Sequence, residues 1–131
     1  MKTKYIPIVI LILLVAFISY KNQKVENLAL KDVSSIEFHY YGTKKLTYIK
    51  DENLEQMKEF ISMYNKAKYY DNTVGTTPSI TVLITLTNEE KITVWGGTQG
   101  FQTVEMKGKQ FNIKGKKLGD YFKELNKQYD S

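Results

Sequence analysis

The side chains that could bind a metal ion or act as nucleophiles are few. The chain contains one histidine, His39, and no cysteine. Protein zinc sites rely on histidine and cysteine ligands, so a zinc site at His39 would need carboxylates alone beside it. Ser34 and Ser35 lie too close to His39 on one extended stretch for a Ser-His-Asp arrangement, and Ser62 and Ser79 carry no nucleophile-elbow motif. We therefore expect no metal ion and no cofactor.

Paired carboxylates are the other residues with catalytic potential. They occur at Asp51-Glu52 and at Glu89-Glu90. General acid and base catalysis needs a carboxyl group in a partly dry cleft, whereas these two pairs lie where a helix start and a turn favour acidic residues. The sequence therefore predicts a protein without catalytic chemistry. A small envelope enzyme that uses Asp or Glu residues is the alternative.

Three glycines stand close together in VWGGTQGF, residues 94–101. A glycine-rich phosphate loop has to open a helix, whose first amides hold the phosphate. Here the alternating run FQTVEM follows, which is typical of a strand. The pattern predicts that Gly96, Gly97 and Gly100 form a hairpin turn, and that the flanking aromatics Trp95 and Phe101 are candidate contacts for a partner.

Two further side chains extend this candidate binding surface. An adjacent pair on a strand faces both ways, so Tyr41 is predicted to present its ring on the outer face of its strand. Leu83 interrupts a polar strand face, and parity places Trp95 on the same outer side. Together Tyr41, Leu83 and Trp95 would form an apolar patch suited to a partner. The alternative is that a helix or loop of the same domain covers them.

The basic residues define which partners are excluded. The formal net charge is +5, and all nineteen basic residues are lysine. Without arginine the chain lacks the planar fork that binds phosphate and guanine in a bidentate manner. From Lys31 onward fifteen lysines face thirteen acids, so the excess positive charge lies mainly beside the amino-terminal apolar segment. Nucleic acid is therefore not expected as a partner.

A lysine cluster stands near the carboxyl end of the sequence. These residues are either solvated turn residues or a contact for anionic lipid or wall polymer, in which case the protein would be a structural tether. The cluster consists of Lys107, Lys109, Lys114, Lys116 and Lys117.

The amino terminus is predicted to be a membrane segment. Sixteen residues from Tyr5 to Tyr20 carry no charge, and lysines flank them on both sides. Such a helix covers about 24 Å of a hydrocarbon core of about 30 Å, and the two tyrosines suit the membrane interfaces. A cleaved signal peptide is the alternative, although no small-x-small cleavage site follows the apolar run.

The domain organisation follows from this segment. Residues 1–20 are the anchor or signal segment, 21–32 a polar juxtamembrane connector, and 33–131 one extracytoplasmic domain. We expect a single-pass protein of the cell membrane whose carboxy-terminal domain lies outside the cytoplasm. Secretion after signal cleavage is the alternative.

Hydrophobic periodicity predicts the elements that position the candidate residues. Strand-like alternation predicts six strands near 34–41, 45–49, 80–86, 92–95, 101–106 and 109–113. Apolar residues recur at steps of three and four over 51–70 and 116–129, which predicts two amphipathic helices. Short turns between consecutive strands indicate an antiparallel sheet with one face covered by the helices. The fold class is α+β, with the order β-β-α-β-β-β-β-α.

Two stretches, ITVLITLTNEEKITVWGG and FNIKGKKLGDYFKELNK, suggest a family. With a threonine-rich strand, an acidic turn, a strand ending in glycine and a closing helix, the last sixty or so residues resemble small membrane-anchored or secreted proteins of Gram-positive bacteria, grouped as domains of unknown function. The resemblance implies a location and an architecture, and it brings no catalytic residues. We expect a membrane-tethered binding or accessory domain that contacts another envelope protein.

Overall fold

The computed structural model describes residues 27–70, 78–96 and 100–130. The predicted membrane segment 1–20, with Tyr5 and Tyr20, and the first part of the predicted connector lie outside these residues. Within the described ranges, no helix is long and apolar enough to cross a membrane.

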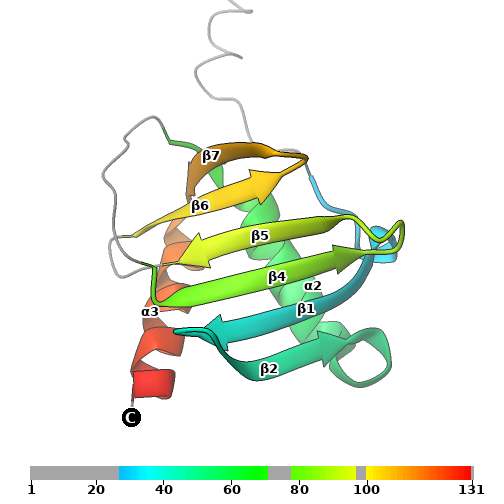
Figure 1. Ribbon diagram of the computed structural model, residues 1–131, viewed down its shortest axis with the longest axis horizontal. Helices are drawn as coiled ribbons and strands as arrows, with labels where there is room; N and C mark the ends of the chain where they lie inside the picture. The colour runs from blue at the N-terminus through cyan, green and yellow to red at the C-terminus, as the bar shows by residue number, and fades with distance from the viewer. Residues whose placement is uncertain (1–26, 71–77, 97–99, 131) are drawn as a thin grey trace, which may run out of the picture.

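The described residues form an α+β domain around one antiparallel sheet, which confirms the predicted fold class (Figure 1). The strands lie in the order β2-β1-β4-β5-β6-β7-β3. The hairpin β1–β2 therefore joins the consecutive strands β4 to β7 through the pairing of β1 with β4. The strands are β1 (Val33–Tyr40), β2 (Thr43–Ile49), β3 (Lys68–Tyr69), β4 (Ile80–Leu86), β5 (Lys91–Gly96), β6 (Phe101–Met106) and β7 (Lys109–Lys114).

The prediction of six strands missed β3. The helical pattern was expected to continue through Tyr70, but α2 (Lys50–Lys66) ends earlier and the backbone of Ala67 is extended. Lys68 and Tyr69 then pair with Lys114 and Ile113 of β7. Two residues cannot display an alternating pattern, so only the neighbouring strand reveals that this segment belongs to the sheet.

Both helices lie on one face of the sheet, behind it in Figure 1, as the one-sided helical stripes predicted. The strand residues directed toward α2 and α3 (Lys116–Asp130) are almost completely buried, while the alternate residues stay partly exposed. The core therefore lies between sheet and helices. Its buried strand residues are Val33, Ile36, Phe38, Ile80, Val82, Ile84, Ile92, Val94, Val104 and Ile113, and the buried helix residues include Met57, Phe60, Tyr64, Leu118 and Phe122.

The glycine cluster does more than form a turn. Gly96 is the last residue of β5, and a Cβ atom there would lie 2.3 Å from the ring of Phe122 on α3. Gly100 has the left-handed φ of 86° that the predicted turn requires, and its carbonyl oxygen lies 3.3 Å from the position of a Cβ on Gly119 of α3. Gly97 lies outside the described residues. Because Gly96 and Gly119 carry no Cβ, α3 lies close against the ends of β5 and β6.

The last part of the predicted connector belongs to the packed unit. Leu28 and Leu30 pack against the core. The side chain of Asn65 on α2 holds Leu28 by two hydrogen bonds, one accepted from the Leu28 amide at 2.8 Å and one donated to its carbonyl at 2.9 Å. This paired hydrogen bond fixes the first described residues on the helix side of the sheet.

Candidate functional site

The face of the sheet opposite α2 and α3, which no helix of the described residues covers, is the candidate functional site and is called the open face here. It faces the viewer in Figure 1. Because strand side chains alternate between the two faces, every second residue of each strand points to it. The central open-face residues are Glu37, His39, Thr81, Leu83, Thr85, Thr93, Trp95, Phe101, Thr103, Glu105 and Asn112.

Apolar side chains cross the open face along a diagonal. Leu83 pairs with Thr93, two residues before Trp95 on β5, and Trp95 pairs with Thr103, two residues after Phe101 on β6. Such diagonal neighbours lie within reach of large side chains. The sheet therefore brings together three of the predicted partner contacts, Leu83, Trp95 and Phe101, and leaves each partly exposed.

Tyr70 contacts Phe101 at the end of this diagonal and was not predicted as a contact. Its ring lies 5.4 Å from the ring of Phe101, and the Lys114 ammonium lies 5.0 Å from the centre of the Tyr70 ring. The Tyr70 amide donates to the carbonyl of Asn112, which continues the β3–β7 pairing. The only signal in the sequence was the adjacent pair Tyr69-Tyr70, whose placement depends on the hidden strand β3. We call Leu83, Trp95, Phe101 and Tyr70 the aromatic band.

Neutral polar residues surround the aromatic band. Thr81, Thr85, Thr93 and Thr103 lie beside the band on β4, β5 and β6, and Glu105 lies opposite Thr93. Thr103 donates a hydrogen bond of 2.8 Å to the side chain of Asn112. An apolar centre with a polar rim and few central charges is the usual anatomy of a protein interface.

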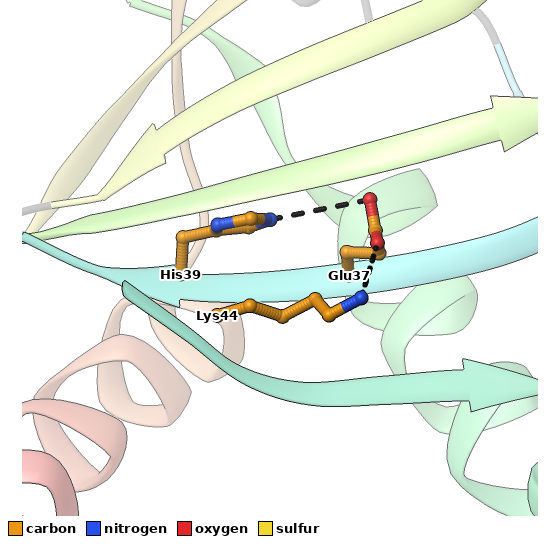
Figure 2. Close-up of polar contacts among 3 residues, drawn as sticks. All are labelled: Glu37, His39 and Lys44. Atoms are coloured by element: carbon orange, nitrogen blue, oxygen red, sulfur yellow. Dashed lines mark hydrogen bonds and ion pairs between the residues drawn. The ribbon is translucent and has the colours of Figure 1, made fainter. Parts of the chain in front are cut away.

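Charged residues lie at the β1–β2 side of the open face (Figure 2). The Glu37 carboxylate lies 3.4 Å from the Lys44 ammonium and 4.0 Å from Nε2 of His39. Register places Glu37 beside Leu83 and His39 beside Thr81, so this trio borders the aromatic band. The Glu37 and His39 side chains are 25% and 27% exposed.

The chemistry available to this trio is limited. Glu37 is already held by a cation, and exposed ion pairs of this kind contribute little stability. In residues 27–70, 78–96 and 100–130 no group of three or more His, Cys, Asp or Glu side chains could hold a metal ion. The trio therefore supplies charge at the rim of the open face, where it can select a partner of complementary charge.

Tyr41 does not lie with the other predicted contacts. It has left the strand and occupies the β1–β2 turn, where its φ is 46° and its side chain is 68% exposed. Its ring lies 4.7 Å from the ring of Tyr40, so the two tyrosines do not face opposite sides of the sheet. Strand parity fails here because β1 ends at Tyr40.

The predicted lysine cluster is divided between the two ends of β7. Lys107 and Lys109 stand at the β6–β7 turn, whereas Lys114, Lys116 and Lys117 stand where β7 ends and α3 begins. A six-residue strand spans about 20 Å, so the two groups do not form one patch. A contact with anionic lipid or polymer through all five lysines remains a prediction with less geometric support than the aromatic band has.

The chain was compared with protein-family models, with curated proteins and with solved structures, and none of the three comparisons found a match. The resemblance to membrane-anchored proteins of Gram-positive bacteria therefore stays a prediction. The open face and its geometry are the basis on which a function can be assigned.

Proposed function

We propose that this protein is a membrane-tethered, extracytoplasmic binding domain that presents its open face to another protein of the cell envelope. The observation that carries this proposal is the aromatic band. Folding explains the apolar residues beneath the helices, but it does not explain Trp95, Leu83 and Phe101 on a face that neither of the described helices α2 and α3 covers. Partly exposed aromatic residues grouped in this way are typical of recognition surfaces.

A protein partner fits this face better than a charged polymer or a lipid surface. The centre of the face is apolar with threonines around it, whereas the Glu37, His39 and Lys44 trio stands at the β1–β2 border and an acid nearer the centre, Glu105, lies opposite Thr93. A surface that contacts an anionic polymer would concentrate lysines at its centre. Complementary packing of apolar side chains, with hydrogen bonds from the rim, is the chemistry that this arrangement offers.

The position of the first described residues supports access to the open face. Asn27 lines a groove with Lys58 and Asn65 of α2, and Leu28 is held by Asn65 on the helix side of the sheet. The described chain therefore starts on the side opposite the aromatic band. A tether attached there would leave the open face available to a partner.

Site-specific crosslinking tests the proposed surface. In the full-length chain, a photoreactive amino acid replaces Thr93 on the open face or, as a matched control, Glu55 on α2, whose side chain is 83% exposed. Irradiation of cells should link a discrete envelope protein to the Thr93 position and not to the Glu55 position. The captured protein is then identified, purified and tested for direct binding to the purified chain.

The aromatic band must be responsible for that binding. Replacing Trp95 and Phe101 by threonine should weaken binding to the purified partner at least a hundredfold, because interface aromatics of this kind each contribute about 2 kcal/mol or more. Threonine suits a strand, so the fold should persist. Equal crosslinking from both positions, or a Trp95→Thr and Phe101→Thr variant that binds normally, would reject the open face as the site.

The location is tested separately from the surface. After alkaline carbonate washing, the full-length chain should stay in the membrane fraction, and protease added outside intact cells should digest the domain. Recovery in the culture medium would instead support a cleaved signal peptide. Protection from external protease would place the domain in the cytoplasm and contradict the proposal.

A further inference from the structure

A second surface feature lies where α3 crosses the strand ends. It is a groove of about 510 Å³, lined from the sheet by Tyr40, Tyr41 and Ser79 and from α3 by Lys123, Asn126, Lys127 and Asp130. In the sheet order β1 and β4 are neighbours, so one wall is formed by adjacent strand ends and the other by a single helix. The groove is distinct from the aromatic band, because none of its lining residues belongs to that band.

Hydrogen bonds hold the two walls in place. The Tyr41 amide donates to the Ser79 carbonyl at 2.9 Å, which fixes the β1–β2 turn to the start of β4. The Ser79 hydroxyl donates to the Asn126 side chain, and the Asn126 amide group donates to the Phe122 carbonyl at 3.0 Å. The Tyr40 hydroxyl donates to the Asp130 carboxylate at 3.1 Å. The groove is thus preorganised, which lowers the entropic cost of binding a ligand.

Tyr41 is unusual for its position. The two-residue turn Tyr41-Gly42 has positive φ angles of 46° and 81°, which is the conformation in which asparagine and glycine are favoured. A tyrosine there carries a backbone cost, yet its ring is 68% exposed and gains little from burial. A strained residue whose large ring stays exposed at the rim of a groove indicates a binding role.

The charge of the groove indicates the class of ligand. Lys123 and Lys127 stand one helical turn apart on α3 and both line the groove. Among the described lining residues the one carboxylate is Asp130, which accepts a hydrogen bond from Tyr40 and offsets the charge of one of the two lysines. The contact of Lys127 with Glu124 is 3.8 Å long and highly exposed, so it does little to neutralise the lysine. The groove therefore presents an excess of cationic donors beside an aromatic ring.

We infer that this groove is a second binding site, which takes an acidic peptide segment of a partner protein. Carboxylates of the peptide would meet Lys123 and Lys127, and an apolar side chain of the peptide would contact the ring of Tyr41. Both contacts lie at the surface, so the interaction depends on charge and weakens with salt.

The test uses the full-length chain in nanodiscs of uncharged phosphatidylcholine. The probe is a fluorescent pentapeptide, Glu-Glu-Phe-Glu-Glu, blocked at both ends, and its neutral counterpart is Gln-Gln-Phe-Gln-Gln. Fluorescence anisotropy should show at least tenfold tighter binding of the acidic peptide at low salt. Raising the salt concentration to about 1 M, where charges are screened beyond about 3 Å, should remove this preference.

Variants locate the binding in the groove. Lys123→Gln combined with Lys127→Gln should weaken binding of the acidic peptide about tenfold. Lys107→Gln combined with Lys109→Gln removes the same charge at the β6–β7 turn and should leave binding unchanged. Trp95→Thr should also leave it unchanged, so failure of this proposal and failure of the proposed open-face function are distinguishable.

Tyr41→Asn separates binding from folding. Asparagine fits the turn, so the midpoint of thermal unfolding should stay the same or rise, while affinity for the acidic peptide should fall at least fivefold. The inference is overturned if the neutral peptide binds as well as the acidic one, or if neither binds. It is equally overturned if both lysine pairs contribute alike, or if Tyr41→Asn lowers the unfolding midpoint without changing the affinity.

Discussion

The two faces of the sheet are built from the same strands but follow different rules. On the helix-covered face, Phe38, Val82 and Val94 are completely buried. On the open face, the residues next to them in the sequence are His39, Leu83 and Trp95, which stay partly exposed. The covered face is apolar apart from the fully buried Gln102 of β6, and the open face mixes a few large apolar side chains with threonines and charges.

The comparison shows which residues folding accounts for. Burial of the covered face supplies the hydrophobic stabilisation of the domain, which explains its apolar residues but not the buried amide of Gln102. The threonines of the open face are also explained, because β-branched residues suit strands. The aromatic band remains unexplained by folding, and this difference carries the proposed function.

Removing a large side chain from the covered face should have the largest effect on stability. Phe38 is fully buried, and its ring packs edge-on against the rings of Tyr48 and Phe60 at 5.1 and 5.6 Å. Phe38→Ala should lower the free energy of unfolding by about 3–5 kcal/mol. Urea denaturation followed by circular dichroism measures this change. A cost below about 1 kcal/mol would mean that the covered face is not the core.

Adding one methyl group to the covered face should have the next largest effect. Gly96→Ala places a Cβ atom within 2.3 Å of the Phe122 ring and should cost about 1–3 kcal/mol. Since the cost comes from this one contact, combining Gly96→Ala with Phe122→Leu should destabilise less than the sum of the two single changes. Additive effects would show that the contact between Gly96 and the Phe122 ring does not cause the cost.

Alkaline pH should lower the free energy of unfolding through ionisation of Tyr121 in the unfolded chain. Burial, and next its hydrogen bond with the Tyr48 hydroxyl at 3.4 Å, raise the pKa of Tyr121. The unfolded chain loses this proton near pH 10, whereas the folded chain keeps it, so stability is complete below pH 10 and falls as the pH rises above it.

The size of this effect is bounded. The slope is at most about 1.4 kcal/mol per pH unit, and the true value is smaller because Tyr121 is only half-buried. Urea midpoints measured from pH 8 to 11 should decline less steeply in Tyr121→Phe than in the parent. Identical slopes would exclude Tyr121, although Tyr129, whose pKa burial also raises, would still contribute.

Changes to the open face should have the smallest effect on stability. Leu83→Thr and Trp95→Thr should each change the free energy of unfolding by less than about 1 kcal/mol, because these side chains are partly exposed and threonine keeps the strand propensity. The same urea measurement applies. A cost near that of Phe38→Ala would show that part of the chain covers this face, and the contrast between the two faces would no longer support a binding surface.

Much of the fold could be predicted from the sequence because it follows from local periodicity. Alternation at Ile36, Phe38 and Tyr40, and at Ile80, Val82 and Ile84, assigns strands and their covered sides without knowledge of the neighbours. The same parity placed Leu83 and Trp95 on the outer face. Short turns then imply antiparallel pairing, which the sheet confirms.

The remaining features depend on contacts between distant segments. Lys68 and Tyr69 become a strand only because β7 lies beside them, and this pairing brings Tyr70 to Phe101. Gly96 is required by Phe122, a residue of another element.

The sequence by itself determined which side chains share a face of each strand, because side-chain direction depends only on position along an extended backbone. The tertiary structure decided where the strands stop and which strands are neighbours. It therefore removed Tyr41 from the open face, divided the lysines between two ends of β7 and joined Leu83, Trp95, Phe101 and Tyr70 into one band. These outcomes depend on pairing and packing energies summed over residues far apart in the chain, which no local pattern contains.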